Sequence, residues 1–184
     1  MDEQSLIAGC IKGNQIAQKT LFESFSPKFF ALCLRYMKST DDAEDVLQEG
    51  MVKIFTKLPE YSGTGSFEGW IRRIMVNTSI DHIRKNKKHN QMLELDDKHG
   101  SFVIDEEEDA GILEHVSFKD LLNMVQFLSP AYRTVFNMYI VDGFTHQEIA
   151  DELKINIGTS KSNLAKAKQK LKKMLLAKIE KMAG

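Results

Sequence analysis

The chain has 184 residues, of which 42% are hydrophobic and 28% charged, a balance typical of a globular protein rather than a disordered one. This length predicts one or two domains, and the low count of 11 Gly and three Pro favours a mostly helical chain. No apolar run approaches the ~20 residues of a membrane-spanning helix. The start, Met1-Asp2-Glu3-Gln4, lacks the plan of a secretory signal. We therefore expect a soluble, cytoplasmic protein.

The formal net charge of −1 conceals a strong division along the chain. Residues 1–90 carry 13 Lys/Arg and 11 Asp/Glu, whereas residues 91–116 carry one Lys and nine acids. Residues 117–184 carry 11 Lys/Arg and six acids. We interpret the acidic segment as a solvated linker between two net-basic domains, because densely packed like charges repel. An acidic tether that competes with nucleic acid for the neighbouring basic faces is the alternative.

The sequence offers no metal site, cofactor site or catalytic centre. Cys10 and Cys33 are too few for a four-ligand zinc site, and we interpret them as small buried hydrophobes. The five histidines are scattered, and none forms a metal-ligand spacing such as His-Glu-x-x-His. An enzyme is therefore disfavoured.

Apolar residues at helical spacing predict a helix that begins with a capping pair, Asp41 and Glu44, and stops at Pro59. Its polar face gives no function by itself, since a solvated surface would look the same. Further apolar residues upstream predict two more helices, which Pro27 interrupts unless it lies in a first turn. The stripe of the capped helix consists of Ala43, Val46, Leu47, Met51, Ile54, Phe55 and Leu58.

A polar, glycine-bearing loop at residues 61–66 opens into a long helix that mixes aromatic, amide and basic side chains. This mixture suits single-stranded nucleic acid, whose phosphates attract positive charge and whose bases stack on aromatic rings. A solvated basic helix end is the alternative. Trp70, at helical spacing with Ile71 and Ile74, is more typical of a core anchor than of a stacking platform.

The C-terminal segment predicts a helix-turn-helix. Ser129-Pro130 starts a helix, and Thr145 with Glu148 forms a capping box for a short helix that a brief turn joins to a long basic one. That last stretch, from Lys154 to Lys181, has nine lysines and one acid. The first of these helices is expected to bury a stripe formed by Val135, Phe136, Tyr139 and Ile140.

These motifs resemble the sigma-70 family of bacterial RNA polymerase sigma factors. The runs DAEDVLQE (42–49), GSFEGWIRRIMVN (65–77) and DHIR (81–84) are similar to its conserved helical domain. The runs GFTHQEIA (143–150) and IGTSKS (157–162) are similar to its C-terminal domain. Two domains and no others is the layout of the extracytoplasmic-function (ECF) group, and the resemblance covers about residues 5–90 and 117–180.

The resemblance implies a role for each motif. Asp45, Gln48 and Glu49 would dock on the coiled coil of the polymerase's largest subunit. Tyr61 and Asn77 would capture a base flipped from the −10 promoter element, at a cost of a few kcal/mol of stacking. The whole set expected at the −10 element is Tyr61, Trp70, Arg73, Asn77, Arg84 and Lys85. The set expected at the duplex −35 element is Thr159, Lys161, Ser162, Asn163 and Lys166. The chain departs from the family at Asn163, where many relatives have Arg, at Ser160, where an apolar residue is usual, and at Ala165, which is slight for a base contact.

The sequence thus predicts an all-α protein with two small helical domains. Residues 1–90 form a region 2-like bundle, residues 91–116 an acidic linker, and residues 117–184 a region 4-like helix-turn-helix domain. The expected partners are core RNA polymerase and promoter DNA. Relatives of this group are commonly held inactive by an anti-sigma factor, although no residue here identifies one. A stand-alone helix-turn-helix DNA-binding regulator is the alternative.

Overall fold

The computed structural model describes residues 2–89 and 117–183. Within these ranges the regular elements are all helices and there is no strand. The chain divides into two compact units, Met1–Ile83 and Arg84–Gly184, and each is described by itself. The predicted acidic linker at 91–116 lies outside the described residues, and the predicted domain bounds stay a prediction.

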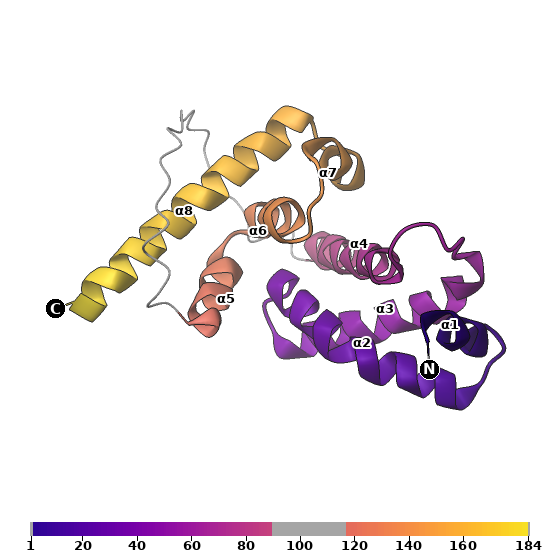
Figure 1. Cartoon of the computed structure of the whole chain (residues 1–184). Helices are drawn as coiled ribbons and strands as arrows, with labels where there is room; N and C mark the ends of the chain where they lie inside the picture. Colours follow the sequence, from indigo (N-terminus) through magenta and orange to yellow (C-terminus); the bar gives the residue numbers. More distant parts are fainter. Residues whose placement is uncertain (1, 90–116, 184) are drawn as a thin grey trace. The chain divides into compact units, whose positions relative to one another are not determined.

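The first unit is a bundle of helices in which α2 packs against both α1 and α3 (Figure 1). Asp2 and Asn14 cap the first two helices by accepting hydrogen bonds from backbone N–H groups of the first turn. The largest fully buried side chains come from α2, α3, η1 and α4, so these elements share one core. The elements are α1 (Glu3–Ile11), α2 (Gln15–Tyr36), α3 (Thr40–Lys57), the 3-10 helix η1 (Leu58–Glu60) and α4 (Phe67–His89).

Helix α3 begins at a different cap from the one predicted. The N-cap is Ser39, whose Oγ accepts from the N–H of Asp42 at 3.1 Å and donates to its carboxylate at 2.7 Å. The prediction that Asp41 and Glu44 start the helix was therefore wrong, because a residue two positions earlier supplies the N-cap. The predicted stop at Pro59 is confirmed, since α3 ends at Lys57 and Pro59 lies in η1.

Pro27 neither interrupts the upstream helices nor begins one, so that prediction was also wrong. It lies inside the continuous helix α2, and its side chain is exposed. A proline there removes one backbone hydrogen bond and crowds the carbonyl four residues earlier. The buried side chains of α2 on either side of it, among them Leu21 and Phe29, hold the helix together across this weak point.

Helices α3 and α4 approach each other closely at Gly50. A Cβ atom placed on Gly50 would overlap with Sδ of Met75, which is fully buried. Polar pairs join the same two helices nearby: His82 Nε2 lies 3.4 Å from a carboxylate oxygen of Asp42, and Lys53 Nζ lies 3.7 Å from Asp81. A side chain at this crossing would have to displace the buried thioether of Met75.

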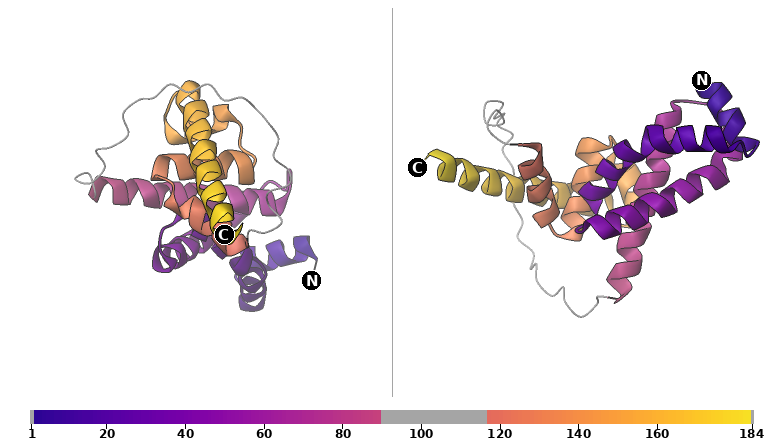
Figure 2. Two further views of the ribbon diagram at one scale, coloured as in Figure 1. Left: turned by 90° about the vertical axis from the view of Figure 1, so that its left-hand side faces the viewer. Right: turned by 90° about the horizontal axis from the view of Figure 1, so that it is seen from below.

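The second unit packs three shorter helices along one long helix. Helix α8 contacts α5, α6 and α7, and Figure 2 shows it as the long yellow helix of this unit. Its core holds Leu128, Tyr132 and Ala167, with Phe136 and Leu171 packed against them. The elements are α5 (Phe118–Phe127), α6 (Pro130–Phe136), the π-helical segment η3 (Asn137–Val141), α7 (His146–Leu153) and α8 (Ile157–Ala183).

The predicted apolar stripe of this unit is wrong at its last two members. Tyr139 and Ile140 are 38% and 47% exposed, whereas Asn137 and Met138 are fully buried. The cause is the π-helical segment, in which the N–H of Asp142 bonds to the carbonyl of Asn137 five residues earlier. The wider turn rotates the following side chains away from the core.

The helix-turn-helix itself is confirmed in its local detail. Thr145 and Glu148 form the predicted capping box at the start of α7. Lys154 closes α7 in the left-handed conformation with φ 55°, which turns the chain directly into α8. A short helix, a tight turn and a long helix are therefore all present.

Both cysteines are buried, as the sequence predicted. Burial raises the pKa of the Cys33 thiol to about 12, and it also raises the pKa of Cys10. Among the described residues, no group of three or more His, Cys, Asp or Glu side chains could hold a metal ion. No helix in that part of the chain is long and apolar enough to cross a membrane.

The crossing at Gly50 yields the first prediction. Gly50→Ala should lower the free energy of unfolding by about 1–3 kcal/mol, because Met75 is buried on all sides and the new methyl group overpacks the core. Urea unfolding of the full chain measures this change. Gly69→Ala is the matched control on α4: its new methyl group meets only ordinary contacts, the nearest 3.6 Å away, and it should leave stability equal or higher. Equal stability of the two variants would contradict the close packing.

Candidate nucleic-acid interface

The polar face of α3 lies opposite its buried face. Asp45 and Gln48 are exposed, and Glu49 is half-buried. Glu49 pairs with Lys53 at 2.9 Å, and Lys53 also reaches Asp81 of α4. The three residues predicted to bind the polymerase therefore share one side of α3, and Glu49 is held in place by its neighbour.

Val52 is a member of this face that the sequence analysis missed. It follows Gln48 by one helical turn and is 65% exposed, unlike the apolar residues of the buried stripe. The sequence already contained the signal, because Val52 falls outside the apolar stripe while lying at i+4 and i+7 from Gln48 and Asp45. The face thus combines three polar residues with one apolar side chain.

Three of the residues predicted to bind the −10 element lie on one stripe of α4. Trp70, Arg73 and Asn77 occupy positions i, i+3 and i+7 of the helix. With a rise of 1.5 Å per residue, the stripe extends over about 10 Å. Arg84 and Lys85 follow on the last turns of α4, half-buried and exposed respectively.

The structure brings Tyr61 against the start of this stripe. Its ring centroid lies 5.3 Å from that of Trp70 and 5.2 Å from that of Phe67. Phe67 in turn stacks on Trp70 and meets Phe25 of α2 edge-on. Trp70 therefore anchors the aromatic cluster, as its helical spacing indicated, and its half-buried ring stands at the edge of that cluster.

The loop between η1 and α4 is held by its own hydrogen bonds. The hydroxyl of Tyr61 donates to the carbonyl of Gly65 at 3.1 Å, and the hydroxyls of Ser62 and Thr64 lie 2.7 Å apart. Gly63 and Gly65 have φ angles of 74° and 79°, which glycine adopts without strain. The loop is thus shaped before any ligand arrives.

Asn77 stands out because its Oδ1 is shielded from solvent and has no hydrogen-bond partner. An unsatisfied buried acceptor costs free energy. Rotation of this side chain towards a ligand would break no protein hydrogen bond at that oxygen.

An ion-pair cluster fixes α4 near its first turn. Glu68 lies 2.6 Å from Lys28 of α2 and 3.2 Å from Arg72 of α4. The hydrogen bond from Lys28 is the main reason that the pKa of Glu68 is below its usual value, and Arg72 adds to it. The carboxylate therefore stays charged and ties the helix that carries Trp70 and Asn77 to the bundle.

The five residues predicted to bind the −35 element lie on the outer side of the first three turns of α8. The side chains of Thr159, Lys161 and Ser162 are exposed, whereas those of Asn163 and Lys166 are half-buried. Residues on the inner side, Ser160, Leu164 and Ala167, are buried. The five predicted residues thus lie on the outer side of one helix.

Tyr132 of α6 holds two lysines of α8 beside this surface. Nζ of Lys166 lies 5.9 Å from the centroid of the Tyr132 ring, and Nζ of Lys170 lies 4.9 Å from it. A cation over an aromatic face is attracted to it. Sequence patterns could not place this ring, because it comes from a different helix.

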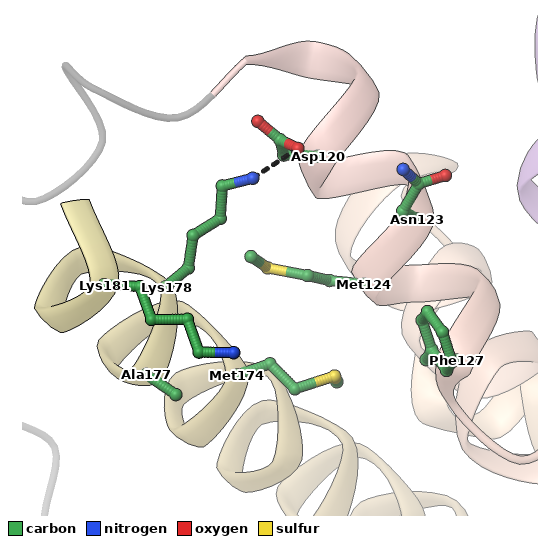
Figure 3. A pocket seen from close by; sticks show the side chains of 8 residues that line it. All are labelled: Asp120, Asn123, Met124, Phe127, Met174, Ala177, Lys178 and Lys181. Carbon is green, nitrogen blue, oxygen red and sulfur yellow. Dashed lines mark ion pairs between the residues drawn. The ribbon is translucent and has the colours of Figure 1, made fainter.

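A hollow of about 430 Å³ lies between α5 and α8, away from the predicted site residues. Figure 3 shows Lys178 reaching Asp120 across one end, with Phe127 at the other. The Lys178–Asp120 distance is 2.5 Å, and Phe127 is 83% exposed. The lining of this hollow is mainly apolar and includes Met124 and Met174, so the hollow does not resemble a phosphate-binding surface.

Comparison with known proteins identifies the family. Residues 21–89 match the family model Sigma-70 region 2, and residues 118–171 match Sigma-70, region 4. RNA polymerase sigma factor SigV of Bacillus subtilis is 30% identical over 139 residues, which cover 76% of this chain and 79% of SigV. The chain belongs to the sigma-70 family of RNA polymerase sigma factors.

Other relatives place this sigma factor in the ECF group. The ECF RNA polymerase sigma factor SigW of Bacillus subtilis is 28% identical, with 89% of this chain and 91% of SigW covered. The ECF RNA polymerase sigma-E factor of Escherichia coli K12 is 24% identical, with 92% of each chain covered.

A solved structure supports the fold of this sigma factor. The sigma factor RpoE, crystallised with the anti-sigma factor NepR from Bartonella quintana, matches with a TM-score of 0.56 at 21% identity. The match covers 85% of this chain and 95% of RpoE. The predicted all-α fold with region 2-like and region 4-like domains is therefore confirmed, as is the sigma-factor interpretation, which displaces the stand-alone regulator. Members of this family are not enzymes.

Proposed function

We propose that this ECF sigma factor binds core RNA polymerase through α3, opens the −10 element at α4 and reads the −35 element with α8. The observation that carries the proposal is the presence of three separate outward surfaces of matching chemistry on helices of the two family domains. A regulator that binds duplex DNA alone would have no use for the first two. The chain acts in the cytoplasm and catalyses no reaction itself.

The α3 face supports a protein partner. Asp45 and Gln48 are exposed beside Val52, and an exposed apolar side chain among polar ones is the composition of a small protein-docking surface. Val52 is continuous with the residues that the family resemblance assigns to core polymerase, so we add it to that set. An anti-sigma factor is a second protein partner, by analogy with the relative crystallised with NepR.

The −10 surface supports capture of an extruded base. The aromatic edge at Tyr61 and Trp70 offers stacking, and Asn77 offers an amide whose Oδ1 is unbonded. Stacking on an aromatic ring and hydrogen bonds to the base edge together offset the cost of unstacking the base. Arg73, Arg84 and Lys85 add positive charge for the opened strand.

The direct test is reconstitution with purified core polymerase. Specific initiation from a promoter selected by the holoenzyme should require this protein, and neither component should initiate specifically alone. Tight promoter binding by the isolated chain, with no effect on the polymerase, would support the stand-alone regulator and contradict the proposal.

A further prediction concerns base capture on α4. Asn77→Ala and Tyr61→Ala should each reduce promoter opening roughly 10- to 100-fold, since base contacts of this type contribute ~1–3 kcal/mol each. Permanganate footprinting of the opened strand measures the loss, and co-purification with core polymerase should remain unchanged. Asn123→Ala, at an exposed asparagine of α5, is the matched control and should open promoters normally. Full opening by both variants would disprove base capture.

The duplex-reading role of α8 predicts a change in salt dependence. Lys161→Ala and Lys166→Ala should each weaken holoenzyme binding to the promoter and lower the slope of log K against log salt by about one unit per lost phosphate contact. A salt titration of promoter binding measures the slope. Lys19→Ala, at an exposed lysine of α2 that pairs with Glu23, should leave it unchanged. A wild-type slope in all three variants would remove these lysines from the DNA interface.

A further inference from the structure

One imidazole connects three elements of the helix-turn-helix unit. His146, the first residue of α7, places Nδ1 2.9 Å from the hydroxyl of Ser160 in the first turn of α8. Its ring also stacks on Tyr139 of η3, with centroids 4.3 Å apart and planes at 23°. Ser160 is fully buried and His146 is half-buried, so this hydrogen bond is partly shielded from solvent.

Ser160 lies between two residues of the predicted DNA-binding surface, so its hydrogen bond to His146 can affect that surface. Its neighbours in the chain, Thr159 and Lys161, are both in the set predicted to meet the −35 element. A hydrogen bond weakens steeply when its length or angle changes, whereas an apolar contact tolerates sliding. The resemblance to sigma factors makes an apolar residue usual here, so this chain fixes the rotation of α8 with a directional bond instead.

We propose that His146 and Ser160 are a positioning pair: their hydrogen bond, with the ring stacked on Tyr139, sets the rotation of the first turn of α8 and thereby the selectivity for the −35 element. This inference rests on the proposed function, because it takes promoter duplex as the ligand of α8. Neither residue needs to touch DNA for the pair to act.

The surroundings keep the imidazole neutral. Burial, followed by the charge of Lys161 on α8, lowers the pKa of His146 below its usual value of 6.5. The Tyr139 ring covers one face of the imidazole. On α7, the helix of His146, the carboxylate of Glu148 accepts hydrogen bonds from the backbone N–H and the hydroxyl of Thr145. The N-terminus of α7 adds positive potential at the same place.

This charge state gives the pair a pH dependence of known sign. The packed imidazole binds a proton less readily than a released one, so acidification favours release. The arrangement is complete above about pH 6.5, the usual histidine pKa, and is lost progressively as the pH falls through the lowered pKa of the packed ring.

The experiment measures selectivity with reconstituted holoenzyme. The readout is the ratio of affinities for a promoter with its intact −35 element and for one with that element scrambled. Ser160→Ala and His146→Phe should each lower the ratio about threefold to tenfold, and the double variant should lower it no further. His146→Asn, whose amide can occupy the place of Nδ1, should retain most of the ratio.

A pH series separates positioning from a merely structural role. Between pH 7.5 and 5.5 the ratio should fall for the wild-type protein and stay flat for His146→Asn and His146→Phe. Unchanged ratios in Ser160→Ala and His146→Phe, additive losses in the double variant, or a wild-type ratio that rises with acid would each overturn the inference. The last result would mean that the imidazolium contacts a phosphate.

Two controls keep this test distinct from the proposed function. A wild-type holoenzyme without any dependence on the −35 element would contradict the proposed function itself. A wild-type protein with such dependence and variants that match it would contradict the positioning pair alone. Thermal unfolding of each full-length variant shows whether it folds. If Ser160→Ala does not fold, the affinity ratios of His146→Asn and His146→Phe are compared instead.

Discussion

The close approach of α3 to α4 at Gly50 is the contact on which both candidate surfaces of the first unit depend. A side chain there would overlap with the thioether of Met75, which is fully buried. The apolar stripes of both helices are buried in the core that they share with α2 and η1, and their remaining faces point outward. One outward face carries Asp45 and Gln48, and the other carries Trp70 and Asn77. A single residue without a side chain thus lets one small bundle present a protein-binding face and a nucleic-acid-binding face at once.

Polar contacts between the helices add to the positioning of α4 that the apolar packing provides. The pairs Lys28–Glu68, Lys53–Asp81 and Asp42–His82 each join α4 to another helix of the bundle. Individually, exposed ion pairs contribute little to stability. Their value here is that one lies in the first turn of α4 and the other two lie together further along it, so they resist its rotation, and rotation of α4 would move its nucleic-acid stripe. In the second unit, hydrogen bonds at the capping box and at Ser160 do the same for α7 and α8.

Much of the fold could be predicted because its signals are local. The capping box at Thr145 and the stop at Pro59 depend on residues within one or two turns of each other. The errors arose where two local signals competed or where the tertiary structure overrode one. Ser39 and Asp41 both begin acceptable caps, and only the completed helix distinguishes them. Pro27 is a helix breaker by local rules, but the burial of its helix on both sides overrides that cost. The π-helical turn at Asn137 has no signature in a pattern of apolar spacing.

The residues of the candidate site also fall into those that local spacing could place and those that it could not. The polar face of α3 and the outer side of α8 follow from helical spacing, so the sequence could place them. The edge of the Tyr61 ring against Trp70 and the cover of Tyr132 over Lys166 join residues from different elements, and no spacing rule reaches them.

Lys154 has a consequence for how the strength of DNA binding can vary among sigma factors of this type. A left-handed backbone disfavours any side chain by roughly 1–2 kcal/mol relative to glycine, while a cation at the end of α7 gains about 0.3–1 kcal/mol from the helix dipole. The two effects are of opposite sign, so the dipole offsets part of the backbone cost. The turn therefore accepts either a lysine or a glycine with a difference of about 1 kcal/mol, and exchanging one for the other changes the charge beside the recognition helix by one unit. A substitution at this position can therefore change the affinity for promoter DNA while the fold stays the same.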